Sequence, residues 1–367
     1  MKILILSWRD IKNPLNGGAE TFTYENAKRW IASGHEVIWF SSDFGDCKKE
    51  ETIDGIKIIR RGTETTVQYQ AFRYYNKFFK GKFDLVIDQI NTIPFFTPLY
   101  VKEKKIALIF QLAREVWFYE IFFPLSLIGF ILEYFYLKIY TKTPVLTISE
   151  STKQNLLNLG FSKDIFILPV GISFKPLEQM PQKEPNPTLI FVGRLRKSKR
   201  IHHIIRALQI IRKKVPNIQL RLVGRSSRPR YMKKLNCLVK KYNLQDNIIF
   251  HGYVDEQTKE DLIKQSHAII ITSIREGWGL VVSEANALST PAVGYNVPGL
   301  RDSIIDGQTG LLTKKNNSSS LAQTILYFFD NEEVYNKLRR RALECARKLS
   351  WETSARESLE AIKRLFS

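Results

Sequence analysis

Short apolar runs alternate with stretches of helical periodicity along this chain. In the first part, such runs predict buried strands over residues 3–6, 35–40, 56–59, 84–90, 106–110, 144–148 and 165–168. Between the first two runs, apolar residues at positions 22, 27, 30 and 31 follow the period of a helix that Ser33-Gly34 ends. This alternation of strand and helix predicts a parallel sheet with helices on both faces.

The same alternation resumes after a proline-rich segment. Five prolines lie between positions 169 and 187, where no helical period is present, and we interpret this segment as an interdomain linker. Apolar runs at 188–192, 220–223, 248–250 and 268–271 then predict a second sheet. The predicted organisation is a first domain over 1–168, a linker over 169–187, a second domain over 188–350 and a terminal helix over 351–367.

The most apolar section lies in the first domain, over residues 121–132, and contains no charged residue. It is shorter than the ~20 residues that a membrane-spanning helix needs, and Pro124 and Gly129 interrupt it. Two interpretations remain: a helix packed in the domain core, or a surface helix that dips into a bilayer.

Composition indicates a globular protein in a reducing compartment. The 367 residues are 44% hydrophobic and 25% charged, which allows sizeable cores. The three cysteines lie far apart, so we expect no disulfide framework. The first apolar run is too short for a signal peptide. We therefore expect a cytoplasmic protein, and a peripheral position on the inner face of the membrane is compatible with its basic charge.

The net charge is +20, and most of the excess lies in one stretch. Residues 193–241 contain 17 Lys or Arg and no Asp or Glu. Such a field attracts nucleotide-sugars, anionic lipid headgroups and nucleic acid, although many of these charges also suit solvated helix faces. No helix-turn-helix, zinc-finger or aromatic-basic sheet motif accompanies the charge, so we expect no nucleic-acid partner.

Residues 275–285, Arg-Glu-Gly-Trp-Gly-Leu-Val-Val-Ser-Glu-Ala, follow the buried run at 268–271 and open a helix. Two glycines at a strand-to-helix turn leave backbone N–H groups at the positive end of the helix dipole, which suits a phosphate. Glu276 and Glu284 add two acidic acceptors for hydroxyl groups. The alternative is a helix N-terminus that is acidic for dipole reasons alone.

The sequence continues with Val297-Pro298-Gly299 and, at 306–312, Asp-Gly-Gln-Thr-Gly-Leu-Leu. This whole run resembles the donor-binding half of the family-4 retaining glycosyltransferases. The resemblance is specific over residues 193–312 and weaker in the first half of the chain. It implies the GT-B fold, an α/β architecture in which two Rossmann-like parallel-sheet domains face an interdomain cleft. In that fold the terminal helix crosses back to the first domain.

The resemblance implies roles for residues at matching positions. Glu276, Arg194 and Lys199 would be catalytic, with Arg194 and Lys199 gripping the donor diphosphate. The implied donor-binding residues are Gly17, Gly18, Arg194, Lys199, Tyr253, Val254, Glu276, Gly277, Trp278, Gly279, Leu280 and Glu284.

One position departs from the family pattern. Many members have a histidine just before the position of Gln111, where this chain has Phe110. Gln111, Arg114 and Glu115 therefore become candidates for the sugar- and acceptor-side role. An ordinary ion-paired loop is the alternative for Arg114 and Glu115.

The resemblance implies a retaining hexosyltransferase that moves a hexose from a nucleotide-diphosphate sugar to a glycan or lipid-linked acceptor. We expect no cofactor and no metal, since two cations and a helix N-terminus can stabilise the leaving diphosphate. Two other functions stay open: a sugar-nucleotide epimerase or hydrolase of the same fold, and a non-catalytic nucleotide-sugar-binding protein. An anionic membrane surface is a further partner compatible with the charge.

Overall fold

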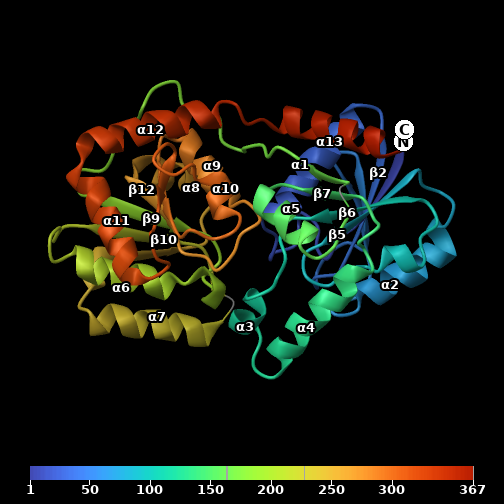
Figure 1. Cartoon of the computed structure of the whole chain (residues 1–367), viewed down its shortest axis with the longest axis horizontal. Coiled ribbons are helices and arrows are strands. Elements are labelled where there is room, and N and C mark those ends of the chain that lie inside the picture. Colours follow the sequence, from blue (N-terminus) through green and yellow to red (C-terminus); the bar gives the residue numbers. More distant parts are fainter. Residues whose placement is uncertain (163, 227, 367) are drawn as a thin grey trace. The chain divides into compact units, whose positions relative to one another are not determined.

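The computed structural model describes residues 1–162, 164–226 and 228–366 and divides the chain into two compact units (Figure 1). Unit 1 contains Met1–Trp117, Phe123–Gly171 and the chain from Ser350 onward. Unit 2 contains Phe118–Phe122 and Ile172–Leu349. Each unit is built on one sheet.

Unit 1 is organised around an eight-stranded sheet with the order β3-β4-β2-β1-β5-β6-β7-β8. Its strands are β1 (Lys2–Leu6), β2 (Glu36–Ser41), β3 (Glu50–Ile53), β4 (Ile56–Arg60), β5 (Leu85–Ile90), β6 (Lys104–Ile109), β7 (Val145–Thr147) and β8 (Ile165–Ile167). Neighbouring strands are parallel except β3 and β4, which form an antiparallel hairpin. The apolar pattern missed β3 because Glu50, Glu51 and Thr52 give it no apolar run.

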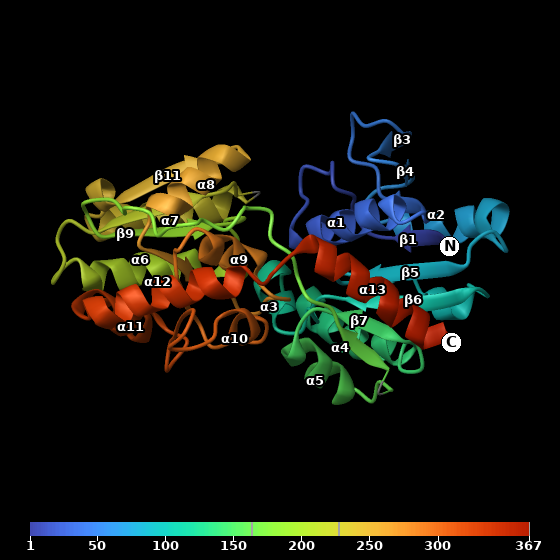
Figure 2. The same ribbon diagram turned by 90° about the horizontal axis from the view of Figure 1, so that it is seen from above.

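Helices cover both faces of this sheet. They are α1 (Gly18–Ala32), α2 (Val67–Tyr74), α4 (Leu125–Lys138), α5 (Glu150–Leu157) and α13 (Trp351–Phe366), with short turns η1 (Tyr75–Phe79) and η2 (Thr97–Leu99). Figures 1 and 2 show α1 and α13 side by side, and Figure 1 shows α2 and α4 on the opposite side of the sheet. Between α1 and α13, Asn26 Nδ2 lies 3.2 Å from Ser354 Oγ, and Trp30 Nε1 donates to Ser358 Oγ at 2.9 Å.

Unit 2 has a six-stranded sheet, parallel throughout, with the order β11-β10-β9-β12-β13-β14. Its strands are β9 (Thr188–Val192), β10 (Gln219–Val223), β11 (Ile248–Gly252), β12 (Ala268–Ile271), β13 (Ala292–Gly294) and β14 (Gly310–Leu312). Leu189, Ile190 and Phe191 of β9 are all buried, as expected for a central strand covered on both faces. The prediction of two parallel-sheet α/β domains is confirmed.

The helices of unit 2 pack on both faces of its sheet, with α6 and α7 on one side and α9 and α12 on the other (Figure 1). The helices and turns are η3 (Lys197–Lys199), α6 (Ile201–Ile211), α7 (Pro229–Lys241), η4 (Gln245–Asn247), α8 (Glu256–Gln265), α9 (Leu280–Ala287), α10 (Leu300–Ser303), α11 (Ser318–Asp330) and α12 (Glu332–Ala346). Helix α3 (Val116–Glu120) begins in unit 1 and ends in unit 2.

The proline-rich segment that the sequence suggests as a linker lies along unit 2 from Ile172 onward. Its backbone is bonded to the rest of that unit: Leu177 N–H donates to Ala287 O at 3.0 Å, and Glu184 N–H donates to Gln265 O at 3.0 Å. From Ile172 the segment is therefore part of the packed surface of unit 2.

Helix α4, which contains most of the apolar run, lies at the surface of unit 1. Leu125 is 48% exposed, Ile128 47% and Leu132 53%. The interpretation of residues 121–132 as a core helix is therefore wrong, because the apolar side chains do not pack inward. No helix in the described part of the chain is long and apolar enough to cross a bilayer.

Candidate functional site

The predicted residues of unit 2 gather at the carboxyl edge of its sheet. From β9 the strand order runs outward to β10 and β11, and from β12 it runs the other way to β13 and β14. The strand order therefore reverses between β9 and β12, and the loops after these two strands run in opposite directions. Open α/β sheets bind ligands at such a point of reversal. Arg194 and Lys199 follow β9, and Glu276 follows β12.

Lys199 and Glu276 form an ion pair between these two loops. The Lys199 ammonium and the Ser273 hydroxyl both donate to Glu276 Oε1. The Lys199 side chain is 29% exposed and that of Glu276 13%, so both are shielded from bulk water yet reachable by a ligand. An ammonium held in this way is a preorganised cation for a phosphate group.

The neighbouring Arg200 connects two loops of the site through hydrogen bonds. Its backbone is left-handed (φ 51°), and its guanidinium donates to Thr272 O at 3.0 Å and to Ser273 O at 2.9 Å. Thr272 Oγ1 in turn donates to Lys199 O at 2.8 Å. These bonds tie the end of β12 to the start of α6 and fix Lys199 in place. Arg194 lies partly buried in the same loop.

Helix α9 begins at Leu280, within the predicted phosphate-binding stretch. Gly279 adopts the left-handed conformation (φ 83°, ψ 64°), which favours glycine. Trp278 Nε1 donates to Ser283 Oγ at 2.9 Å and so holds the indole on the first turn. The backbone of Gly277 and the residues after it therefore stands at the positive end of the helix dipole, as an anion site requires.

The Pro298-Gly299 turn lies directly against Glu276. Glu276 N–H donates to Pro298 O at 3.1 Å. Gly299 has a φ of 82°, and a Cβ at this position would lie 2.0 Å from Glu276 O. Only glycine lets the two backbones approach this closely, so the turn helps to set the position of Glu276.

Glu284 of α9 pairs with Lys259 of α8 at 3.3 Å, and Lys259 also pairs with Glu256 at 2.6 Å. Burial raises the pKa of Glu284, and Lys259 opposes this in part. Burial disfavours charge on Lys259, but Glu284 and Glu256 outweigh it and raise the pKa of the lysine. In the described part of the chain, no group of three His, Cys, Asp or Glu side chains is arranged to hold a metal ion.

Tyr253 and Val254 follow β11 at the same edge of the sheet. The Tyr253 side chain is 68% exposed, and Arg225 Cζ lies 5.0 Å from the centre of its ring. Val254 packs against the core of unit 2. The resemblance implies that the backbone of Tyr253 and Val254 contacts the nucleobase of the donor, and this role stays a prediction.

Gly17 and Gly18 stand at the start of α1, beside the point where the strand order of unit 1 reverses between β1 and β5. Gly17 is extended (φ −162°), and its N–H donates to Glu20 Oε2 at 2.8 Å. Asn91, after β5, donates to Glu20 Oε1 at 3.4 Å. The glycine pair thus forms a capped helix start, and its role toward a donor stays a prediction.

A buried ion pair that the sequence did not reveal anchors the chain ahead of Gly17. Asp10 and Arg60 are both fully buried, with Nε–Oδ2 at 2.6 Å and a second bond from Nη2 to Oδ1 at 2.8 Å. Ser41 Oγ also donates to Asp10 Oδ2, at 2.8 Å. The pair joins the loop after β1 to the end of β4, and no local motif marks either residue.

Phe110, which stands where many family members have histidine, is a packing residue here. It is 6% exposed, and its ring meets that of Phe22 edge to face with 5.3 Å between centres. Thr152 Oγ1 donates to Phe110 O at 3.0 Å. Gln111 follows, and its Oε1 is buried with no hydrogen-bond partner among the described residues. Since buried amide oxygens are normally paired, Gln111 is a suitable acceptor for a ligand donor.

Glu133 of α4 holds the loop that carries Arg114 and Glu115. The N–H groups of Ala113 and Arg114 donate to its two carboxylate oxygens at 2.6 and 2.7 Å, and Trp117 Nε1 donates at 3.3 Å. Burial raises the pKa of Glu133, and these bonds oppose the rise. Arg114 itself is left-handed (φ 41°), and Glu115 is exposed. A single glutamate directly after the apolar run gave no sequence signal for this role.

Glu120, at the end of α3, is another residue that the sequence did not reveal, and it belongs to unit 2. Its Oε1 accepts Ser198 N–H at 3.2 Å and Ser198 Oγ at 2.5 Å. Arg228 donates to Glu120 O at 2.6 Å and lies 3.3 Å from Oε2. Glu120 thus braces the η3 turn that carries Lys199.

The two sheets and their helices define a protein of the GT-B type. The family model described as "Glycosyltransferase Family 4" matches residues 16–175, and the one described as "Glycosyl transferases group 1" matches residues 175–345. The chain belongs to family 4 of the GT-B glycosyltransferases, as the resemblance predicts.

Individual relatives agree with this assignment. The capsular polysaccharide biosynthesis glycosyltransferase CapM of Staphylococcus aureus is 26% identical over 210 residues, which are 53% of this chain and 54% of CapM. The chain spans about half the length of the curated relatives that it matches.

Solved structures extend the likeness to the whole fold. Sucrose-phosphate synthase from Thermosynechococcus elongatus superposes with a TM-score of 0.83 at 20% identity, over 100% of this chain and 99% of that one. HepE from Anabaena, in complex with UDP-glucose, gives 0.76 at 16% identity, over 99% and 100%. At these identities the likeness establishes the fold.

Proposed function

We propose that this protein is a retaining hexosyltransferase that moves a hexose from a nucleotide-diphosphate sugar to a glycan or lipid-linked acceptor without a metal ion. The observation that carries the proposal is the Lys199–Glu276 ion pair beside the N-terminus of α9. It combines a cation for the leaving diphosphate, a carboxylate for the sugar hydroxyls and a helix dipole for an anion.

The predicted residues after β9 and β12 each have a role in this reaction. Arg194 and Lys199 neutralise the charge that develops on the departing diphosphate. Glu276 and the backbone of 277–280 hold the sugar and its phosphate, while Glu284 accepts hydrogen bonds from the ribose hydroxyls. The acceptor hydroxyl attacks the anomeric carbon on the face from which the diphosphate leaves, so the configuration is retained.

The donor and the acceptor follow from two further considerations. HepE was solved with UDP-glucose, so a UDP-hexose is the first donor to test. CapM is named for capsular polysaccharide biosynthesis, which favours a glycan acceptor. The three cysteines lie far apart in the sequence, which suits a reducing compartment, and we propose that the reaction takes place at the cytoplasmic face of a membrane.

The test is a screen of the purified chain against UDP-, GDP- and ADP-hexoses, with and without extracted polar lipids and oligosaccharides. We expect one nucleotide-sugar to raise the Tm, and nucleotide to be released with product only when an acceptor is present. The anomeric configuration of the product, read by NMR, tests retention. The reaction is repeated with EDTA, which should leave the rate unchanged.

Other outcomes would select the other functions. Donor consumed without any acceptor would indicate a hydrolase or an epimerase. Binding without turnover under every condition would indicate a nucleotide-sugar-binding protein. In that case Phe110→His, which restores the residue common in the family, should be tested for a gain of turnover.

A further inference from the structure

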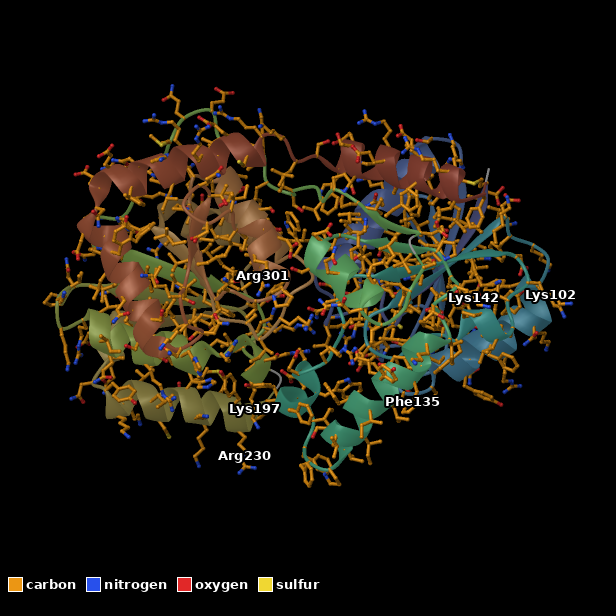
Figure 3. All side chains as sticks on the ribbon, viewed as in Figure 1. Lys102, Phe135, Lys142, Lys197, Arg230 and Arg301 are labelled. Atoms are coloured by element: carbon orange, nitrogen blue, oxygen red, sulfur yellow. The ribbon has the colours of Figure 1, made fainter. Side chains whose placement is uncertain are left out.

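An apolar surface on unit 1 is left exposed by the described residues of that unit. It consists of Phe123, just before α4, and five side chains of α4: Leu125, Ile128, Ile131, Leu132 and Phe135. We call this set the α4 surface. Their exposed fractions run from 46% for Ile131 to 75% for Phe123. Phe135 lies on the outer side of the helix (Figure 3). Contiguous exposed apolar patches of this kind usually mark an interaction site.

The orientation of α4 is fixed by its polar side, which faces the protein. Ser126 and Glu133 are each only 2% exposed. Glu133 accepts hydrogen bonds from two backbone amides of the loop after β6 and from Trp117 of α3. Gly129 completes the contact, because a Cβ there would lie 2.5 Å from the Trp117 ring. The helix therefore buries Ser126 and Glu133 and presents most of its apolar side chains, the reverse of an ordinary surface helix.

The charges around this helix favour a bilayer as the occupant. No charged residue occurs from Ile121 to Leu132, whereas Lys138 and Lys142 stand at and after the C-terminal end of α4. The Lys138 ammonium lies 4.7 Å from the Tyr134 ring, and both side chains are exposed. Helix α2, on the same side of the sheet (Figure 1), adds exposed Arg73, with exposed Lys77 in the following η1 turn. An uncharged apolar zone bordered by cations matches an acyl layer beneath anionic headgroups.

The length of the helix determines how it can bind. Helix α4 has 14 residues, or about 21 Å, which is less than the ~30 Å of a hydrocarbon core. It can therefore lie along the interface but cannot cross it. A second copy of the chain is a poorer occupant, because two molecules of net charge +20 repel each other whereas an anionic bilayer attracts each one.

We infer that the α4 surface inserts into the headgroup–acyl boundary of an anionic bilayer, with α4 parallel to the membrane plane and the lysines in the headgroup layer. The inference deepens the proposed function, because the α4 surface would hold the enzyme at the bilayer that contains a lipid-linked acceptor. That link to the acceptor rests on the proposed function. Binding to lipid itself does not depend on sugar transfer.

The experiment measures sedimentation of the full chain with vesicles of phosphatidylglycerol and phosphatidylethanolamine, and with vesicles of phosphatidylcholine alone. We expect binding to the anionic vesicles that weakens with salt. The double variant Ile128→Glu/Ile131→Glu should lower the partition coefficient about tenfold or more, because both side chains enter the acyl boundary. Lys138→Gln/Lys142→Gln should weaken binding mainly at low salt.

The matched control is Ile249→Glu/Ile305→Glu. Ile249 and Ile305 are 47% and 44% exposed, against 47% and 46% for Ile128 and Ile131, and they lie in unit 2. This control should bind vesicles like the wild type, and all three double variants should keep the wild-type circular dichroism. Equal losses of vesicle binding in Ile128→Glu/Ile131→Glu and in Ile249→Glu/Ile305→Glu would overturn the proposal. The proposal would also be overturned if the wild type were a dimer and Ile128→Glu/Ile131→Glu dissociated it without changing vesicle binding.

The donor-induced rise in Tm separates this proposal from the proposed function. If the wild type does not bind vesicles but its Tm still rises with a nucleotide-sugar, the inference about the α4 surface fails and the proposed function stands. Vesicle binding without any response to a nucleotide-sugar would support the membrane surface and contradict the transferase.

Discussion

Glu120 and Ser198 are 78 positions apart in the chain, yet the Glu120 carboxylate accepts both the N–H and the hydroxyl of Ser198. Ser198 is the middle residue of the η3 turn, and Lys199 is the last. The contact therefore couples the end of α3 to the loop that presents the proposed phosphate-binding lysine. It makes Glu120 a positioning residue, which acts on the donor through Lys199.

Removing this brace should weaken donor binding more than it slows the chemical step. A hydrogen bond to a charged group contributes about 1.5–3 kcal/mol, so Glu120→Ala should raise the donor KM about tenfold. Glu120→Gln retains an acceptor oxygen and should recover most of the loss. The control is Glu184→Gln, which breaks the Glu184–Arg221 ion pair of the same unit. A fall in kcat with an unchanged KM would contradict the positioning role.

The Lys199–Glu276 pair is the part of the site that we expect to act on the reaction itself. Lys199→Ala and Glu276→Ala should each lower kcat by about 10²–10³-fold, as removal of a preorganised transition-state contact does. The double variant should lose much less than the product of the two effects, because the residues act as a pair. Exposed Lys197, in the same turn (Figure 3), is the control, and Lys197→Ala should retain most activity. Wild-type turnover in either single variant would refute the assignment.

Gly299 gives a test of how the loop geometry supports Glu276. In Gly299→Ala the new Cβ would meet Glu276 O at 2.0 Å, so the turn and Glu276 must move apart. Gly307→Ala is the matched control, because Gly307 also has a positive φ (71°) but has open space around its Cβ position. Gly307→Ala should lose about 1 kcal/mol of unfolding free energy to backbone strain alone. Gly299→Ala should lose more, because its Cβ also meets backbone atoms of Glu276. Only Gly299→Ala should also lose donor binding, which a titration with nucleotide-sugar measures.

The sequence predicted those features that depend on local pattern. The uninterrupted apolar runs of β9 and β12 were sufficient to place the second sheet, and the two glycines around Trp278 marked the start of α9. Lys199 and Glu276 were selected by their positions after strands. Their mutual contact follows from the strand order, which brings the ends of β9 and β12 together at one edge.

The features that the sequence missed depend on contacts between distant segments. Glu120, Glu133 and Lys259 are single charged residues without a local motif, and each has a partner in another element. The position of α4 could not be decided from its composition, because an apolar helix suits both a core and a membrane surface. The contacts of Glu133 decided it by fixing the polar side of the helix inward.

Glu284 links the proposed ribose site to the pH dependence of stability. Burial raises its pKa above the 4.5 of an unperturbed glutamate, so the folded chain holds this proton more tightly than the unfolded chain. Its contribution to stability is therefore complete below about pH 4.5 and is lost as the pH rises through the raised pKa. Glu284→Gln cannot lose a proton and lacks this dependence. The unfolding free energy of the wild type minus that of the variant should thus fall as the pH rises from about 4.5.

Urea unfolding followed by circular dichroism at a series of pH values measures this difference. The contributions of other buried carboxyls, such as Asp88, cancel in this difference because both proteins contain them. Glu256→Gln removes the other carboxylate that pairs with Lys259 and serves as the control for loss of charge alone. The Glu256 side chain is 70% exposed. Only Glu284→Gln should also lower nucleotide-sugar affinity, because a neutral amide accepts hydrogen bonds from ribose hydroxyls more weakly than a carboxylate does. A difference that stays constant with pH would show that Glu284 is not held in a buried, proton-retaining environment.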